Sequence, residues 1–394
     1  MKKIAFFVQH MLCGGVENAL YNLSKELVEN GHDVTIYVIS KTGEFIDKIP
    51  EGVKLKKLEI PKHIEKFLPV GGIKLALKNK LNNKKIYDAL VMLLREMCYR
   101  PDFSETNVNF DSIPNLSEQF DIAVCYHIHS PFLVKYVSEK VNSKKKLAWI
   151  HNDFKTTEYE IEKLKKYVEK YDKFYCVAKQ LRDEFLDIFP EYDKKTFISY
   201  NIVPVTEIKQ KGNEYTPKEY KDNFNKIPLL LSVGRLEKRK GYDLSIKVCK
   251  MLKQKGYKFK WFILGEGSER DSLEKMIKKY DLEDFIFLLG IRTNPYPYFK
   301  NCDIYIQTSR HEGYVTTVTE AKIFNKPIIT TDVSGAKEQI VNGENGYIVN
   351  FSEQEVYEKI ASLLDNENIQ NEMSRKLKKT NWIENSEICK LFVN

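Results

Sequence analysis

Short apolar runs alternate with amphipathic stretches along most of this chain of 394 residues. Residues 2–8 and 122–126 have the composition of buried strands, and in 16–29 the leucines recur at the spacing of one helix face. Buried strands that alternate with helices form parallel sheets with helices packed on both faces. The alternation therefore predicts an α/β protein built from doubly wound parallel sheets.

A polar segment divides this alternation into two series. It is rich in Lys, Asn, Glu and Pro and has no clear periodicity. The chain is also too long for one hydrophobic core, so we predict two Rossmann-like domains whose carboxyl edges face each other across a cleft. The domains are 1–203 and 228–380, joined by a connector at 204–227 and followed by a tail at 381–394 that packs back on the first domain.

The stretch Ser309–Ala321 carries two carboxylates, Glu312 and Glu320. It follows the apolar strand 303–307 and leads into an amphipathic stretch that ends before Pro327. Ligands of an open parallel sheet bind at the carboxyl ends of its strands, where this stretch lies. The backbone amides of the next three residues open a helix and suit an anion; these residues are Gly313, Tyr314 and Val315.

Both acids also have simple structural interpretations. Thr317 to Glu320 fits a capping box, in which the glutamate only satisfies the start of a helix. Glu312 on its own fits a solvated loop acid. From these residues alone, the structural and the functional interpretations both stay open.

Other loops after predicted strands carry cations, glycines or histidines. Arg235 and Lys240 lie in one loop, which suits a dianion, although a solvated basic loop is the alternative. The pair Gly14-Gly15 allows close approach of a ligand or simply a tight turn, and it is not the GxGxxG dinucleotide fingerprint. Three histidines follow strands of the first domain, where an ordinary loop histidine is the alternative; they are His127, His129 and His151.

The net charge of +8 is concentrated in residues 61–100, which contain nine Lys or Arg and three Asp or Glu. Interleaved apolar residues predict helices with a basic face, which is either solvated or contacts an anionic membrane surface or acceptor. No nucleic-acid motif occurs, so we expect no nucleic-acid partner. Seven scattered cysteines without CxxC spacing, and no long apolar run, are typical of a reduced, cytoplasmic protein.

Taken together, these residues resemble the retaining glycosyltransferases of family 4 (glycosyl transferases group 1), which have the GT-B fold. The resemblance covers nearly the whole chain, and it is ordered in the second domain and looser in the first. It implies an acceptor-side first domain and a nucleotide-sugar-binding second domain. The residues that carry it are Val233–Leu236, Lys240-Gly241, Gly265–Gly267, Asp303, Ser309–Gly313 and Glu320, of which the last two form the family's Glu-x7-Glu pattern.

The resemblance implies a role for each matching residue of the second domain. Arg235 and Lys240 hold the donor diphosphate, Glu320 takes the ribose hydroxyls, and Glu312 faces the donor sugar as a catalytic residue. Further donor contacts come from Gly313, Tyr314 and Val315, and the nucleotide base lies by Gly290, Ile291 and Arg292. Gly234, next to Arg235, is a further candidate site residue.

In the first domain, the resemblance implies that Gly14 and Gly15 close over the donor phosphate and that His151 is catalytic near the reacting sugar. His127 and His129 compete for the role of His151, and Asn201 matches a residue on the hinge side. The His127/His129 pair and the basic segment depart from the general family pattern, so they leave the acceptor open.

These implications favour retaining transfer from a nucleoside-diphosphate sugar, with UDP-sugar preferred, to a saccharide or lipid-linked acceptor. We expect this in bacterial surface polysaccharide or glycan assembly, in the cytoplasm or peripherally on the inner face of the plasma membrane. No Asp-x-Asp occurs, so Arg235, Lys240 and helix N-termini are expected to neutralise the diphosphate without a metal or other cofactor. A nucleotide-sugar epimerase of the same architecture and a non-catalytic nucleotide-sugar-binding partner subunit remain alternatives.

Overall fold

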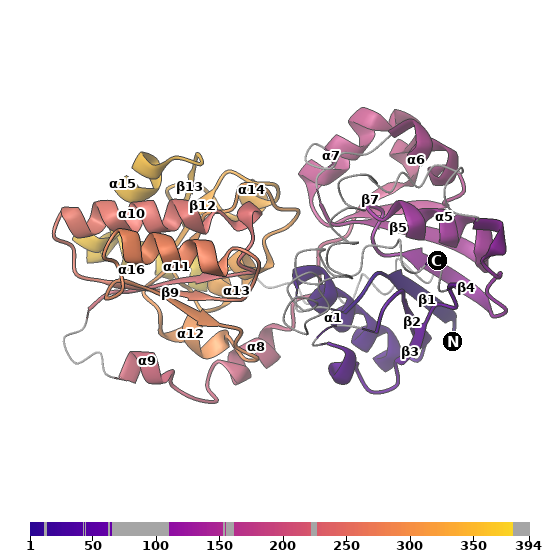
Figure 1. Cartoon of the computed structure of the whole chain (residues 1–394), viewed down its shortest axis with the longest axis horizontal. Helices are drawn as coiled ribbons and strands as arrows, with labels where there is room; N and C mark the ends of the chain where they lie inside the picture. The colour runs from indigo at the N-terminus through magenta and orange to yellow at the C-terminus, as the bar shows by residue number, and fades with distance from the viewer. Residues whose placement is uncertain are drawn as a thin grey trace, which may run out of the picture. The chain divides into compact units, whose positions relative to one another are not determined.

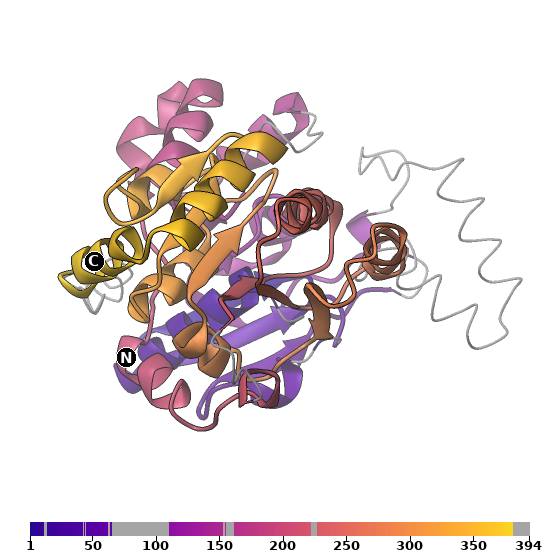
Figure 2. The same cartoon turned by 90° about the vertical axis from the view of Figure 1, so that its left-hand side faces the viewer.

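A computed structural model describes residues 1–11, 14–41, 43, 45–61, 64, 110–152, 154, 161–221 and 227–380. The basic segment at 61–100 lies outside these residues except for Pro61 and Ile64, and the tail at 381–394 lies outside them entirely. The described residues divide into two compact units, which can be followed in Figures 1 and 2. Unit 1 contains residues from 1–177 and 181–202, and unit 2 contains 178–180 and those from 203–380.

Within its described residues, unit 1 is built on a parallel sheet of seven strands in the order β3-β2-β1-β4-β5-β6-β7 (Figure 1). The strands are β1 (Lys3–Val8), β2 (Asp33–Val38), β3 (Lys54–Lys57), β4 (Gln119–Cys125), β5 (Asn142–Ile150), β6 (Lys173–Cys176) and β7 (Thr196–Ile198). The α-helices are α1 (Gly15–Glu29), α5 (Pro131–Lys140), α6 (Ile161–Val168) and α7 (Lys179–Ile188), and 3-10 turns occur at Ile46–Lys48, Phe110–Ser112 and Pro190–Lys195.

The apolar run that opens the chain forms the central strand β1, as the sequence predicts. Ile4 lies opposite Val34 of β2 on one side and opposite Ile122 of β4 on the other. From β1 the chain continues to β2 and β3 on one side, whereas β4 to β7 extend the sheet on the other side. The winding direction therefore reverses between β1 and β4, and such a switch point is where open α/β sheets bind ligands.

Unit 2 has a parallel sheet of six strands, counted over its described residues, in the order β10-β9-β8-β11-β12-β13. The strands are β8 (Leu229–Val233), β9 (Lys260–Leu264), β10 (Ile286–Gly290), β11 (Ile304–Gln307), β12 (Ile328–Thr331) and β13 (Tyr347–Val349). The helices are α8 (Val205–Lys211), α9 (Lys218–Lys221), α10 (Tyr242–Gln254), α11 (Arg270–Lys279), α12 (Tyr296–Asn301), α13 (Thr316–Ile323), α14 (Ala336–Gln339), α15 (Glu353–Asp365) and α16 (Glu367–Lys378), with a 3-10 turn η4 at Lys238–Lys240.

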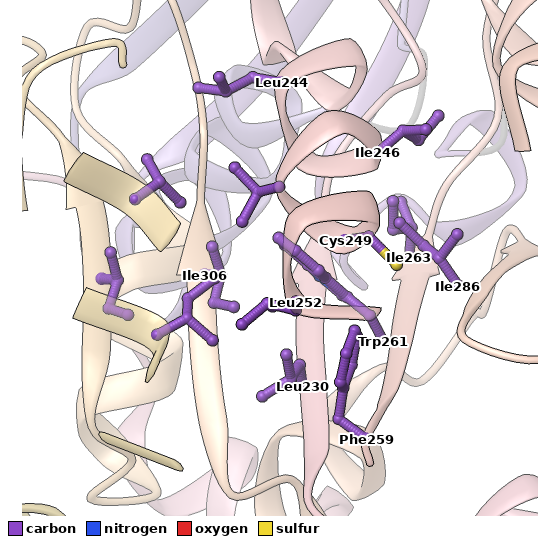
Figure 3. Packing of buried hydrophobic residues seen from close by; sticks show 14 of the residues in the cluster. Leu230, Leu244, Ile246, Cys249, Leu252, Phe259, Trp261, Ile263, Ile286 and Ile306 are labelled. Atoms are coloured by element: carbon purple, nitrogen blue, oxygen red, sulfur yellow. The ribbon is translucent and has the colours of Figure 1, made fainter. Parts of the chain in front are cut away.

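The unit 2 sheet is buried on both faces. Leu252 of α10 and Trp261 of β9 belong to one apolar cluster, which Figure 3 shows at close range. Val318 of α13 belongs to a second cluster on the other face. Leu230 and Leu231 are adjacent in β8 but belong to the first and the second cluster respectively, because successive side chains of a strand point to opposite faces.

The predicted fold class is confirmed: the chain contains two Rossmann-like parallel-sheet units. Two stretches are more regular than the sequence indicates. Helices α8 and α9 lie in the predicted connector, where the buried Ile208 anchors α8. Helix α12 lies in a Pro-interrupted stretch, because Pro295 and Pro297 occupy the start of a helix, where proline is tolerated.

Candidate active site

Two loops of unit 2 lie at the switch point of its sheet. The first loop, residues 234–241, follows β8, and the second loop, residues 308–315, follows β11. β8 and β11 are neighbours in the sheet, and the later strands on their two sides wind in opposite directions. These two loops therefore occupy the position where an open α/β sheet binds its ligand.

Two glycines allow the first loop to approach the second. Gly241 has a φ of +67°, and a side chain there would overlap the carbonyl oxygen of Thr308. A Cβ atom at Gly234 would lie 2.9 Å from the hydroxyl of Tyr242 and 3.2 Å from the side chain of Lys240. The missing side chain at Gly234 thus leaves room for the aliphatic chain of Lys240, and the one at Gly241 lets the two loops come into contact.

Arg310 fixes the two loops to each other. Its backbone N–H donates to the carbonyl oxygen of Arg239 at 2.7 Å, and its guanidinium donates to both carboxylate oxygens of Asp243 at 2.8 and 2.7 Å. Thr308 also donates its hydroxyl to the carbonyl oxygen of Lys240 at 3.2 Å. A bidentate Arg–carboxylate contact is directional, so Lys240 is held in place by both loops.

Glu312 is a buried acid with four polar neighbours. Only 8% of Glu312 and 8% of Lys240 is exposed, and the ammonium of Lys240 donates to Oε1 of Glu312. The hydroxyl of Ser309 donates to the same oxygen at 2.6 Å, and Nη1 of Arg239 lies 3.5 Å from Oε2. The amide of Gln307 donates to Oε1 at 3.3 Å. The interpretation of Glu312 as a solvated loop acid is therefore wrong.

The surroundings of Glu312 favour its charged form. Burial by itself raises the pKa of this carboxyl group, because desolvation penalises the charge. The charges of Lys240 and Arg239, with hydrogen bonds from Lys240 and Ser309, outweigh burial and hold the pKa of Glu312 below its ordinary value. Burial lowers the pKa of Lys240 from its ordinary value, whereas the charge of Glu312 and the hydrogen bond to it oppose that change. Glu312 and Lys240 therefore favour each other's charged forms as a buried ion pair.

Glu320 lies one turn into α13, whose N-cap is Val315 and makes no side-chain cap bond. Thr317 is the second residue of the helix, so the capping-box interpretation of Glu320 is wrong. Glu320 is 9% exposed, and burial raises its pKa to about 8, although a hydrogen bond with Tyr296 opposes the rise. This acid is therefore protonated at neutral pH, and its carboxyl group can both donate and accept hydrogen bonds.

The loop Gly313–Val315 leads directly into α13. Gly335, with a φ of +77°, packs against it, and a Cβ atom there would lie 2.9 Å from the ring of Tyr314. The carbonyl oxygen of Val315 accepts a hydrogen bond from the side-chain amide of Gln339 at 3.3 Å. The start of α13 is thus held next to the two acids, and helix N-termini attract anions.

The first loop contains an acid, Glu237, that pairs with two of its own arginines. Nη1 of Arg235 lies 2.9 Å from one carboxylate oxygen of Glu237, and Nε of Arg239 donates to the other oxygen at 2.9 Å. The side chain of Arg235 is 41% exposed. Ion pairs at such exposure contribute little to stability, so an anionic ligand can compete with Glu237 for this arginine.

Gly290, Ile291 and Arg292 lie at the end of β10. Gly290 has a φ of +76°, and Ile291 is 44% exposed. The guanidinium of Arg292 donates to the hydroxyl of Tyr298 at 3.0 Å and to Glu219 of α9 at 3.2 Å. The charge of Arg292 is therefore already engaged within unit 2, whereas Ile291 presents an apolar surface.

Gly14 and Gly15 open helix α1, with Gly14 as its N-cap. The carboxylate of Glu17 covers Gly14 so closely that a side chain at Gly14 would overlap it. Glu17 is 8% exposed, and Nδ1 of His10 lies 3.4 Å from its Oε1. Burial raises the pKa of Glu17, but the hydrogen bond with His10 and the nearby His127 outweigh burial and lower it.

His127 and His151 lie together at the carboxyl ends of β4 and β5, with ring centroids 5.9 Å apart. His151 is 3% exposed, and its ring packs against Tyr126 at a centroid distance of 4.5 Å. Burial, followed by His127 and His129, holds the pKa of His151 well below its ordinary value, so its imidazole is neutral. Among the described residues, Nε2 of His151 has no hydrogen-bond partner.

The other two candidates of unit 1 have different surroundings. Nε2 of His129 accepts a hydrogen bond from the backbone N–H of Asn152 at 3.2 Å, and its ring packs on Phe154. Asn201 is half-buried in the segment after β7. The structure therefore brings His127 and His151 together and gives His129 a separate local contact.

The described part of the chain lacks two further kinds of feature. No group of three or more His, Cys, Asp or Glu side chains is placed to hold a metal ion there. No helix in the same residues has the combined length and apolar character that crossing a membrane requires.

In each unit, some residues beside the candidate positions were not foreseen from the sequence. Gln307 ends an otherwise apolar strand and contacts both Ser309 and Glu312. Glu17 and His10 lie beside the glycine pair. A signal was present for Gln307, because a polar residue that ends a buried strand at the carboxyl edge of a parallel sheet is placed toward the ligand side.

Two family models match this chain. Residues 217–380 match the family model described as "Glycosyl transferases group 1", and residues 13–207 match "Glycosyltransferase Family 4". The chain therefore belongs to the group 1 glycosyltransferases of family 4.

Relatives with curated names include an uncharacterized glycosyltransferase of Methanocaldococcus jannaschii, 30% identical over 45% of this chain and 44% of the relative. An N-acetylgalactosamine-N,N'-diacetylbacillosaminyl-diphospho-undecaprenol 4-alpha-N-acetylgalactosaminyltransferase of Campylobacter jejuni is 31% identical over 50% of this chain and 52% of the relative. The match to these relatives thus spans about half of their length. An uncharacterized glycosyltransferase of Haemophilus influenzae is 25% identical over 95% of this chain and 94% of the relative.

Solved structures with the same fold include Anabaena HepE in complex with UDP, with a TM-score of 0.67 and 14% identity. The match covers 99% of this chain and 95% of HepE. A mutant of Staphylococcus aureus TarM in complex with fondaparinux, alpha-GlcNAc-glycerol and UDP has a TM-score of 0.67 and 18% identity, over 99% of this chain and 98% of TarM. These likenesses confirm the GT-B fold.

The raised pKa of Glu320 predicts how its replacement changes stability with pH. The folded-state pKa of about 8 exceeds the unfolded value of about 4.3, so the stabilising effect of the protonated acid is present below pH ~4.3 and is lost as the pH rises to about 8. Glu320→Gln stays neutral throughout. Relative to wild type, it should therefore gain on the order of 3–5 kcal/mol in free energy of unfolding between pH 5 and pH 9.

Urea unfolding of both proteins at pH 5, 7 and 9 measures this difference. The exposed Glu283→Gln serves as the control and should show no such trend. A difference between Glu320→Gln and wild type that stays constant with pH would contradict a buried, neutral Glu320.

Proposed function

We propose that this protein is a glycosyltransferase that transfers a sugar from a nucleoside-diphosphate sugar to a hydroxyl group of a saccharide or lipid-linked acceptor. The observation that carries the proposal is the grouping of buried Lys240, Glu312 and Glu320 with Arg235 at the switch point of the unit 2 sheet. Membership of the glycosyltransferase family supports it. A sugar nucleotide matches these residues, because its negatively charged diphosphate lies between the hydroxyl groups of the ribose and those of the sugar.

The diphosphate would bind to Lys240, Arg235 and the amides at the start of α13. Lys240 is paired with Glu312, and Arg235 with Glu237. A diphosphate offers both cations more negative charge than a single carboxylate does, so it would replace these partners. The helix start adds N–H groups that suit a phosphate oxygen.

The two acids would then take different hydroxyl groups of the donor. Glu320, protonated and buried, would bind the ribose hydroxyls, to which a carboxyl group can donate as well as accept. Glu312 would lose part of its contact with Lys240 and face the donor sugar. Ile291 would offer an apolar surface to the base.

We favour a UDP-sugar and retention at the anomeric carbon. HepE and TarM were solved in complex with UDP, and the names of the Campylobacter relative and of a Staphylococcus aureus poly(ribitol-phosphate) alpha-N-acetylglucosaminyltransferase specify α linkages. The bond from the anomeric carbon to the phosphate oxygen breaks, the acceptor oxygen bonds to that carbon on the same face, and the acceptor proton passes to the leaving phosphate. In this scheme, Lys240 and Arg235 stabilise charge on the leaving group without a metal.

The acceptor and the location of the protein are further parts of the proposal. The name of the Campylobacter relative contains a diphospho-undecaprenol, which supports a lipid-linked acceptor in bacterial surface glycan assembly. We propose action in the cytoplasm or at the inner face of the plasma membrane.

His151 is proposed to contribute to catalysis as a neutral imidazole, and His151→Ala should lower turnover while leaving binding of UDP intact.

A thermal-shift panel of nucleoside diphosphates and their sugars tests the donor class. A ligand that binds only the folded state at 100 times its Kd adds about 2.7 kcal/mol and raises the melting temperature. We expect the largest shift with UDP and one UDP-sugar, unchanged by EDTA. No shift with any nucleoside diphosphate would contradict the proposal.

Product analysis then separates the alternatives. A glycosyltransferase consumes the selected donor faster when an acceptor is present and releases the nucleoside diphosphate. Conversion of the donor to an isomeric sugar nucleotide without acceptor would instead indicate an epimerase. Binding without slow hydrolysis or transfer would indicate a non-catalytic binding subunit.

Single substitutions should separate binding from catalysis at the unit 2 site. Arg235→Ala and Glu320→Ala each remove hydrogen bonds to the donor and should weaken its binding about ten- to hundredfold. Glu312→Gln should lower kcat roughly 10²–10³-fold with little loss of donor affinity. Calorimetric Kd values and kcat for each variant test this division, with the exposed Glu283→Gln as the control. Wild-type donor affinity in Arg235→Ala would contradict the assignment of the diphosphate seat.

A further inference from the structure

A buried chain of polar side chains connects β11 to Glu312. Gln307 is 2% exposed and Ser309 is fully buried. The side-chain amide of Gln307 donates to the hydroxyl of Ser309 at 2.6 Å and to Oε1 of Glu312 at 3.3 Å, and Ser309 donates to the same Oε1 at 2.6 Å. These contacts link the acid to the last residue of β11.

The orientation of the Gln307 amide is fixed by its other neighbours. Its Oε1 accepts hydrogen bonds from the hydroxyls of Tyr305 at 2.6 Å and Thr317 at 3.3 Å. A carboxylate only accepts hydrogen bonds, so the NH₂ group of Gln307 must be the end that faces Glu312. Both ends of this amide are therefore used, and a reversed amide would place its oxygen against the carboxylate oxygen of Glu312.

The two oxygens of Glu312 are consequently not equivalent. Oε1 accepts from Lys240, Ser309 and Gln307, whereas Oε2 has the guanidinium of Arg239 at 3.5 Å. Three donors on one oxygen fix the plane of the carboxylate and leave Oε2 as the oxygen available to a ligand. If Lys240 turns to an anionic ligand, Ser309 and Gln307 still hold Oε1.

We propose that Gln307 and Ser309 are positioning residues that hold Glu312 with Oε2 directed at the donor sugar. This inference rests on the proposed function and assigns a role within the same site. An apolar residue at position 307 would also fit a buried strand, as Ile304 and Ile306 do in the same strand. The side-chain amide of Gln307 instead donates a hydrogen bond to Glu312. Because this amide is neutral, it adds no further charge next to the carboxylate.

Gln307→Glu is the sharpest test, because it replaces the neutral amide by a second carboxyl group about 3 Å from Glu312. Two carboxyl groups at this distance cannot both ionise freely, so one pKa of the pair rises. The charged or titratable groups that face Glu312 are Lys240 and Arg239 of η4, Tyr242 of α10 and Tyr305 of β11. None of these is changed by the substitution.

In a plot of kcat against pH, we expect the acidic limb of Gln307→Glu to lie more than one pH unit higher than that of wild type, because the pKa of the carboxyl pair rises. Gln307→Leu and Ser309→Ala should lower kcat at least tenfold with less than a threefold change in KM for the donor. Their acidic limb should move upward less than that of Gln307→Glu, because each loses only a hydrogen bond to the carboxylate and adds no second acid. Ser232→Ala is the matched control, since it removes a buried hydroxyl that bonds to Ile306 and Trp261 and does not touch Glu312. Ser232→Ala should leave the dependence of kcat on pH unchanged.

Melting temperatures provide a readout that needs no substrate. A raised pKa in the folded state costs stability as the pH rises, so the difference between Gln307→Glu and wild type should widen from pH 5.5 to pH 8.5. The difference for Gln307→Leu should stay constant over that range. A constant difference for Gln307→Glu would overturn the inference, because Glu312 would then not sense position 307.

The remaining outcomes separate this inference from the proposed function. A widening melting difference with an unshifted rate profile and near-normal kcat would overturn the positioning role while leaving the glycosyltransferase proposal standing. Wild-type protein that binds and turns over no sugar nucleotide would refute the function, and the positioning role would fall with it. A purely structural role for Gln307 predicts lower melting temperatures with unchanged kinetics in every variant.

Discussion

The unit 2 site is organised around one buried ion pair, between Lys240 and Glu312 at the switch point of the sheet. Removing two charges from water costs several kcal/mol for each ion, and such pairs rarely stabilise a fold more than apolar packing would. Their place in the fold offers a better explanation. β8 and β11 end side by side, and each delivers one member of the pair to the edge where open sheets bind ligands.

The surrounding structure holds the side chains of Lys240 and Glu312 in place. Gly241 adopts a left-handed backbone against Thr308, Arg310 bridges the two loops, and Gln307 and Ser309 hold one carboxylate oxygen. Among the described residues, no cation offsets the burial of the nearby Glu320, so this acid stays neutral while Glu312 stays charged. Two glutamates eight positions apart thus acquire different protonation states from their surroundings.

Sequence reasoning predicted the sheets and the outline of the unit 2 site for a definite reason. Apolar runs such as 2–8 are buried on both sides in a parallel sheet, so their composition is diagnostic. The burial of individual side chains and the residues that they contact were harder to predict from the sequence. Nothing local shows that Glu312 meets Lys240, 72 positions earlier, or that Thr317 lies inside a helix that begins one residue before it. Gln307 and Glu17 were missed because their roles arise from tertiary contacts, and the helices in the connector were missed because burial at Ile208 outweighs a weak periodic pattern.

The central claim is that Lys240 exchanges Glu312 for a diphosphate, and calorimetric titration of UDP into wild type, Lys240→Met and Glu312→Gln tests it most directly. Because Glu312 competes for the same cation, Glu312→Gln should bind UDP at least as tightly as wild type. Lys240→Met should lose at least a factor of ten in affinity, as expected when a charged hydrogen bond of about 1.5–3 kcal/mol is removed. Equal affinity of wild type and Lys240→Met, or clearly weaker binding by Glu312→Gln, would contradict the claim.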